Sequence, residues 1–179
     1  MRRRHRHDVR AALARGPGPG RARRRPDRDP HAGGDAECCA VEARAFAGRC
    51  GFDVESQWEL AIAVSELVTN VLKFAIEGTL TITYARHAGH GVDARDRVAI
   101  EVVDRGSGFA GRALRVARQL TTGGAPGTFD ADLDADLHAE RRPGQSLGVG
   151  LACVRRMTDH VTIESSGAGS RVVALKYRR

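Results

Sequence analysis

Apolar residues recur every three or four positions over residues 60–75, the spacing of a helix with one broad buried face. They are Leu60, Ala63, Val64, Leu67, Val68, Val71, Leu72 and Ala75. A second stripe of this kind covers residues 36–50 and stops at Gly51, a residue suited to a helix C-terminus. Asp53 is placed to cap the helix that follows. The pattern predicts two consecutive helices, the second running to Gly78.

Beyond that helix the apolar period changes from three or four to two, which is typical of half-buried strands. Alternating apolar residues predict strands near residues 79–85, 97–104, 159–165 and 171–177. The first two are joined by a loop rich in Gly, His and Asp, so we expect them to form an antiparallel pair. A third apolar helix follows the glycine cluster at 144–150.

Two polar residues interrupt the apolar face of the helix over 60–75. Glu66 and Asn70 are four positions apart, so their side chains stack one turn above the other, and Lys73 continues the same side. Such residues either lie at the edge of the stripe and meet water or belong to a site. The pair alone does not decide between these interpretations.

Two glycine clusters favour a site. Residues 104–108, DRGSG, follow a predicted strand, and residues 148–151, GVGL, open the third helix. A glycine-rich turn at a helix start presents free backbone N–H groups and the positive end of the helix dipole, which suit phosphate oxygens. Each cluster alone is a weak signal.

In this order, E-L-x-x-N, D-x-G-x-G and G-x-G-L resemble the three nucleotide-binding boxes of the gyrase, histidine kinase and mismatch-repair ATPase superfamily. Within that superfamily, residues 63–70, 148–159 and 163–165 resemble the anti-sigma-factor serine/threonine kinases, above all the switch-kinase branch. The resemblance extends from about residue 35 to 177.

The resemblance implies an α/β two-layer sandwich of the histidine-kinase-like ATPase (Bergerat) type: a mostly antiparallel mixed sheet with three helices on one face. The N-terminal strand usual in the family has no clear counterpart before Asp35. The implied function is an ATP-dependent serine/threonine protein kinase that phosphorylates a small STAS-type anti-sigma-factor antagonist. The alternative is an ATP-binding module that sequesters a sigma factor or activates a PP2C-type phosphatase with little catalysis.

The family roles fall on matching residues at the phosphate end of the implied site. Asn70 would coordinate Mg²⁺ that bridges the phosphates of ATP, and Glu66 would accept the proton of an incoming serine hydroxyl. Gly148 and Gly150 would let backbone amides approach the phosphates. Lys73 either offsets phosphate charge or is a solvated helix lysine. Phosphoryl transfer needs little beyond positioning and charge stabilisation, so this small set would suffice.

At the adenine end, the resemblance makes Asp104 the acceptor for the amino group of the base. Gly106 and Gly108 would allow the turn beneath the base. The family commonly has Thr near the adenine at the position of Ser170, and Ser170 keeps the hydroxyl.

The net charge of +7 suggests a nucleic-acid binder at first sight. Residues 1–30, however, hold eleven arginines against three aspartates, a net of +8, which leaves −1 for the rest of the chain. Because no aromatic residue interleaves with the arginines, nucleic-acid binding is disfavoured. The segment 1–34 is rich in Arg, Pro and Gly, and we expect it to be disordered, so that removing residues 1–30 leaves stability unchanged.

The remaining residues, 35–179, form one predicted domain, in which 110–147 is interpreted as a nucleotide lid with an acidic insertion. No apolar run is long enough to span a membrane, and the arginine-rich start lacks the apolar core of a secretory signal. We therefore expect a cytoplasmic protein. Its four cysteines lack metal-ligand spacing, which favours reduced core thiols.

Overall fold

The computed structural model describes residues 7–14, 36–86, 95–108 and 147–179. Of the predicted lid and acidic insertion at 110–147, residues 110–146 lie outside the described residues, as does most of the predicted disordered tail, and Leu147 begins a helix. No helix among the described residues is long and apolar enough to cross a membrane.

Five strands form one sheet in the order β1-β2-β3-β5-β4, and every neighbouring pair is antiparallel. The strands are β1 (His7–Ala14), β2 (Ala75–Ala85), β3 (Arg97–Gly106), β4 (His160–Ser166) and β5 (Gly169–Tyr177). The predicted antiparallel pair is therefore β2 and β3. The described sheet is antiparallel throughout rather than mixed, because each strand runs opposite to the strand it pairs with.

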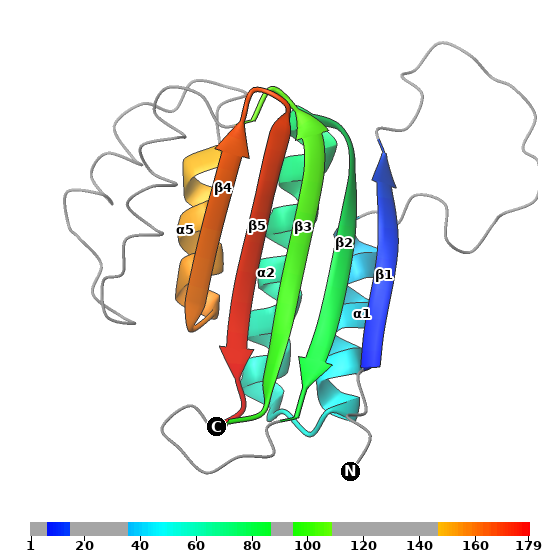
Figure 1. Cartoon of the computed structure of the whole chain (residues 1–179). Helices are drawn as coiled ribbons and strands as arrows, with labels where there is room; N and C mark the ends of the chain where they lie inside the picture. Colours follow the sequence, from blue (N-terminus) through cyan, green and yellow to red (C-terminus); the bar gives the residue numbers. More distant parts are fainter. Residues whose placement is uncertain (1–6, 15–35, 87–94, 109–146) are drawn as a thin grey trace, which may run out of the picture.

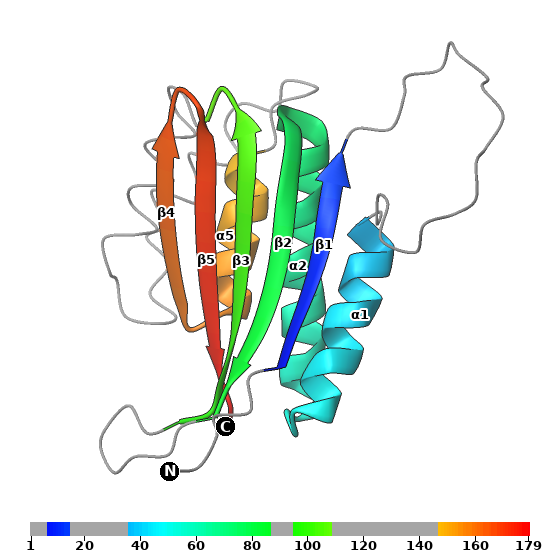
Figure 2. The ribbon, with the colours of Figure 1, turned by 45° about the vertical axis from the view of Figure 1, so that its right-hand side comes forward.

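In the described part of the chain, three helices cover one face of this sheet, as Figures 1 and 2 show. They are α1 (Ala36–Arg49), α2 (Val54–Phe74) and α5 (Leu147–Met157). This arrangement confirms the predicted α/β two-layer sandwich with its helices on one side. It leaves the other face of the sheet uncovered by any described helix.

The turn between α1 and α2 has the predicted chemistry. Gly51 adopts φ +78°, and the amides of Gly51 and Phe52 donate to the carbonyls of Gly48 and Ala47 in a Schellman arrangement. Asp53 then caps α2, because its Oδ1 accepts from the amide of Ser56 at 2.8 Å. These hydrogen bonds hold α1 and α2 side by side.

The prediction that α2 runs to Gly78 is wrong, since the helix ends at Phe74 and β2 begins at Ala75. Ala75 has extended backbone angles and donates its amide to the carbonyl of Val71. A Cβ on Gly78 would lie 2.8 Å from Cγ1 of Val71, so the strand passes close to the end of the helix. Pairing of β2 with both neighbours provides backbone hydrogen bonds that a longer helix would forfeit.

The expectation of disorder over residues 1–34 is wrong for His7–Ala14, which form the edge strand β1. Val9 and Ala11 pack against the core, and Leu13 is 1% exposed. The alternation is carried by small residues among arginines, so it is weak as a sequence signal. β1 supplies the N-terminal strand for which the sequence gives no clear counterpart.

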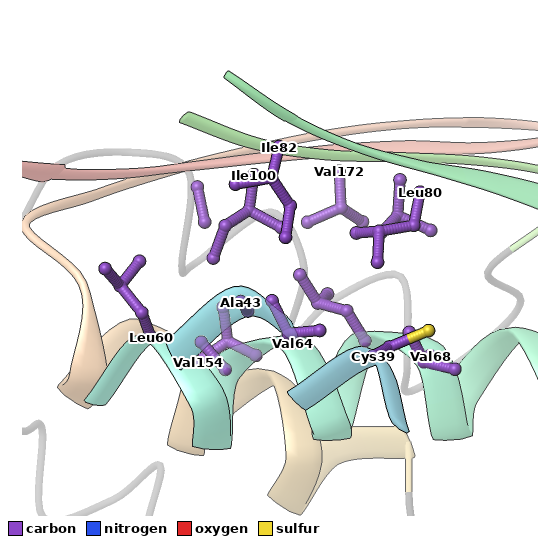
Figure 3. Packing of buried hydrophobic residues seen from close by; sticks show 14 of the residues in the cluster. Cys39, Ala43, Leu60, Val64, Val68, Leu80, Ile82, Ile100, Val154 and Val172 are labelled. Atoms are coloured by element: carbon purple, nitrogen blue, oxygen red, sulfur yellow. The ribbon is translucent and has the colours of Figure 1, made fainter. Parts of the chain in front are cut away.

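The core lies between the sheet and the helices, and Figure 3 shows aliphatic side chains of both layers meeting there. Its largest fully buried members come from α2, α5 and the strands β1, β2, β3 and β4. The four cysteines are reduced thiols, as predicted, and Cys39 is buried in the core. Cys38 is exposed, so the prediction of a core position is wrong for that residue because it lies on the outer side of α1.

Candidate active site

A pocket that is open to solvent lies between α2, α5 and the ends of β3 and β5. Its empty space, counted together with the open solvent at its mouth, is about 440 Å³. The pocket is lined by Leu67, Asn70, Val71, Phe74, Ala75, Val102, Asp104, Gly108, Leu151, Ser170 and Val172. Four of the predicted site residues, Asn70, Asp104, Gly108 and Ser170, are among them.

One end of the pocket is built around Asp104. Asp104 of β3 lies opposite Ser170 of β5 in the sheet register. The amide of Ser170 donates to Asp104 Oδ1 at 3.3 Å, and the Ser170 hydroxyl donates to Oδ2. A carboxylate has about four acceptor positions, so it can accept a further hydrogen bond from a ligand. Ser170 therefore orients a carboxylate that faces the pocket.

Glycines allow the chain to approach this end closely. Gly108 has φ +65°, and a Cβ there would lie 2.1 Å from the carbonyl oxygen of Ser166. Gly169 has φ +144°, and its Cβ would lie 2.1 Å from the carbonyl oxygen of Asp104. A side chain at either position would push β5 or the turn after β3 away. Gly106 ends β3 against Ala75 and does not line the pocket.

At the other end, α5 packs directly on the polar residues of α2. A Cβ on Gly150 would lie 2.8 Å from Oε2 of Glu66 and 3.4 Å from Nδ2 of Asn70. A larger residue at position 150 would require the end of the Glu66 side chain or the helix to shift. Gly148 is the second residue of α5, so the predicted glycine pair lies within the first turn of the helix.

The side-chain nitrogen of Asn70 is buried and has no hydrogen-bond partner in the described structure. An unsatisfied buried polar group costs about 1–3 kcal/mol, so a ligand that pairs with this amide is favoured. The amide oxygen and nitrogen exchange places on a flip, so Asn70 can present either atom to a ligand. Its oxygen suits a hard cation such as Mg²⁺.

No group of three His, Cys, Asp or Glu residues able to hold a metal occurs in the part of the chain that the structure describes. Mg²⁺ is commonly bound through one or two protein ligands together with phosphate oxygens and water. The residues present therefore fit a metal that is held by Asn70 and by a nucleotide, rather than one held by the protein alone.

Cys153 lies on α5 beside this end of the pocket. Burial raises the pKa of its thiol, and the charge of Glu66 raises it further. The thiol is therefore protonated and uncharged next to the Glu66 carboxylate. Lys73 is exposed in the last turn of α2 and does not line the pocket.

Sequence reasoning missed the apolar wall of the pocket. Leu67, Val71 and Phe74 of α2 form part of it with Val102, Leu151 and Val172. Their sequence signals, a helical stripe and strand alternation, are the same as those of core residues. Only the packing of α5 against the sheet shows that this apolar surface borders an opening.

This chain is similar to several known proteins. A family model described as the histidine kinase-like ATPase domain matches residues 36–176. Serine-protein kinase RsbW of Listeria monocytogenes serovar 1/2a is 30% identical over 136 residues, which are 74% of this chain and 73% of that protein. The histidine kinase domain of the Erythrobacter litoralis EL346 blue-light activated histidine kinase has a TM-score of 0.39 and 17% identity. That match covers 76% of this chain and 56% of the solved chain.

Proposed function

This chain belongs to the histidine kinase-like ATPase family, and we propose that it is an ATP-dependent serine/threonine protein kinase of a partner-switching pathway. Its substrate is a small STAS-type anti-sigma-factor antagonist, and phosphorylation of that protein regulates a sigma factor. Such a kinase acts in the cytoplasm, where sigma factors are found. The match to a serine-protein kinase over 74% of the chain supports the activity.

One observation carries the proposal: the two ends of a single pocket hold the two kinds of group that ATP requires. Asp104 and Ser170 form a hydrogen-bonded acceptor pair at one end. Asn70 lines the other end, and beside it Gly150 brings α5 against Glu66, which lies next to the pocket rather than in its lining. The apolar wall between the ends suits the flat faces of a purine.

At the adenine end, the Asp104 carboxylate accepts a hydrogen bond from the exocyclic amine of the base. The amide and the hydroxyl of Ser170 both donate to the Asp104 carboxylate and hold it in place. Less entropy is therefore lost in ordering the Asp104 side chain when a ligand binds. Gly108 lets the turn after β3 lie against Ser166. The hydrogen bond favours adenine over bases that present a carbonyl oxygen at that position, because two acceptors would then face each other.

At the phosphate end, the start of α5 directs its free amides and its helix dipole toward negative charge. Asn70 would hold Mg²⁺, which when bound offsets the charge of the phosphates. Lys73 could add positive charge, although its exposure and its position outside the pocket lining favour a solvated lysine.

Glu66 acts as the general base. It lies one turn before Asn70 on α2, so a hydroxyl that reaches its carboxylate is also next to the phosphate end. Glu66 takes the proton of the serine hydroxyl as the oxygen attacks the terminal phosphoryl group of ATP.

The direct test is phosphate transfer from radiolabelled ATP to individually purified STAS-type domains encoded in the source genome. We expect one of them to be labelled on a serine or threonine, and Asn70→Ala to weaken both nucleotide binding and transfer. Labelling of none of these domains would refute the kinase proposal. A domain that binds but is not labelled would identify a sequestering module instead.

A further inference from the structure

Three exposed apolar side chains form a stripe along the outer side of α2. Val54, Trp58 and Ile62 are 63%, 51% and 38% exposed, and they follow one another at four-residue intervals. Residues four apart are neighbours on a helix surface, so the three side chains form one continuous strip. The strip is unusual because α2 already buries its opposite side in the core.

The strip leads directly to the proposed general base. Glu66 is the next residue in the four-residue series after Ile62, and it lies about 12 Å along the helix axis from Trp58. Beyond Glu66, the surface continues into Asn70 and the nucleotide pocket. A protein that offers a hydroxyl to Glu66 without displacing the nucleotide can therefore lie over the N-terminal part of α2.

A protein interface of ordinary size that is centred on Glu66 would reach the strip. A specific complex buries about 800 Å² on each partner, which corresponds to a patch of roughly 16 Å radius. A patch of that radius centred on Glu66 includes Ile62 and Trp58. An interface here would bury two large apolar side chains that solvent now contacts, and this burial is favourable.

Arg44 adds a charge to the strip. Its guanidinium lies 3.9 Å from the ring centroid of Trp58, a cation–π contact. Within the described ranges, no carboxylate forms an ion pair with Arg44. Trp and Arg are the residues most enriched among interface positions that dominate binding energy. The positive charge of Arg44 favours a partner with an acidic side chain.

We propose that Val54, Trp58, Ile62 and Arg44 form the docking surface for the protein that this kinase phosphorylates. The occupant is the STAS-type antagonist, which would present apolar residues and one acidic side chain beside its acceptor serine. The inference rests on the proposed function, because Glu66 fixes where the acceptor must sit.

Trp58 is the only tryptophan of the chain, so its fluorescence reports on this surface directly. The full-length protein is titrated with each purified STAS-type domain, with any tryptophan of that domain replaced by phenylalanine. We expect the substrate domain to change Trp58 emission in a saturable way. Mg-ATP alone should leave the emission nearly unchanged, because Trp58 does not line the pocket.

Kinetics of the variants provide the second measurement. Trp58→Ala, Ile62→Ala and Arg44→Ala should each raise the KM for the substrate domain, with Trp58→Ala raising it roughly 10- to 30-fold. The affinity for Mg-ATP should stay unchanged. Val103→Ala is the matched control, since Val103 is 43% exposed on the sheet face opposite the helices. Ile62→Ala retains Trp58 and its stack with Arg44, so it remains informative if Trp58→Ala does not fold.

Three results would overturn the inference. The first is that a STAS-type domain is phosphorylated, but its binding does not change Trp58 emission and the variants have the same KM for it as the unmodified protein. The second is a shift in the monomer–dimer equilibrium of the variants without any change in KM, which would assign the strip to a second copy of this chain. The third is the absence of binding by every STAS-type domain. Binding at the strip without transfer would instead retain the docking surface and refute the kinase activity.

Discussion

Gly150 of α5 and Glu66 of α2 are in contact across the interface of the two helices, where a Cβ on Gly150 would come within 2.8 Å of Glu66 Oε2. The contact joins the proposed phosphate-binding helix to the proposed base. Because real Cβ atoms do not approach an oxygen this closely, a larger residue at position 150 must displace the Glu66 side chain or α5.

Gly150→Ala should therefore impair phosphoryl transfer. A displacement of about 1 Å at a reacting group can cost on the order of 100-fold in rate, and we expect a loss of that order in kcat. The control is Gly167→Ala in the β4–β5 turn, where a Cβ would meet nothing within 4 Å. Equal kcat values for the two variants would show that the contact does not position Glu66.

Asp104→Asn should weaken ATP binding by about 1–3 kcal/mol. The amide loses the charge that strengthens the hydrogen bond to adenine, and it must direct its only oxygen to both Ser170 and the base. Calorimetric titration with ATP measures the loss. Glu101→Gln on the same strand removes an exposed charge paired with Arg171 and should bind ATP as the unmodified protein does. Unchanged affinity in Asp104→Asn would refute the assignment of the adenine end.

The helices and most of the strands could be predicted from the sequence because they depend on local patterns, whereas the two-layer arrangement and the site residues were implied by the resemblance to a known family. The stripe of α2, the cap at Asp53 and the glycine clusters each lie within a few consecutive residues. What the sequence could not predict depends on contacts between distant segments. Nothing near Ala75 in the sequence indicates that strand pairing ends α2 at Phe74. The contact between Gly150 and Glu66 joins residues 84 positions apart.

β1 illustrates the same limit. Its residues are small and lie among arginines, so local propensity favours no structure, and the strand is specified by pairing with β2. Burial of the side-chain nitrogen of Asn70 could not be predicted from the sequence either, because it depends on the three-dimensional surroundings of that atom.

Leu13→Ala should destabilise the protein by about 2–5 kcal/mol, the usual cost of truncating a fully buried leucine. Denaturant unfolding gives this value. Arg10→Ala on the exposed side of the same strand should change stability by less than about 0.5 kcal/mol. If Leu13→Ala and Arg10→Ala both changed stability equally and only slightly, β1 would not pack on the core. Removal of residues 1–30 would then leave stability unchanged.

The cap of α2 should make stability depend on pH in acid. Hydrogen bonds from Ser56 lower the pKa of Asp53 below its ordinary value of 3.8. Since the folded-state pKa is depressed, the stabilisation is present above that value and is lost as the pH falls through the folded-state pKa. Asp53→Asn keeps an acceptor but cannot titrate. Its melting temperature should be lower than that of the unmodified protein at pH 7, and the difference should shrink toward pH 2. A constant difference would contradict this assignment.

The central claim, that Glu66 is the base of a protein kinase, is tested most directly by Glu66→Gln. Transfer to the substrate domain and Mg-ATP affinity are measured on the same preparations. A glutamine keeps the size of the side chain but cannot take the serine proton, so we predict near-normal Mg-ATP affinity and transfer slowed by roughly 10²- to 10⁴-fold. Unchanged transfer in Glu66→Gln would contradict the account.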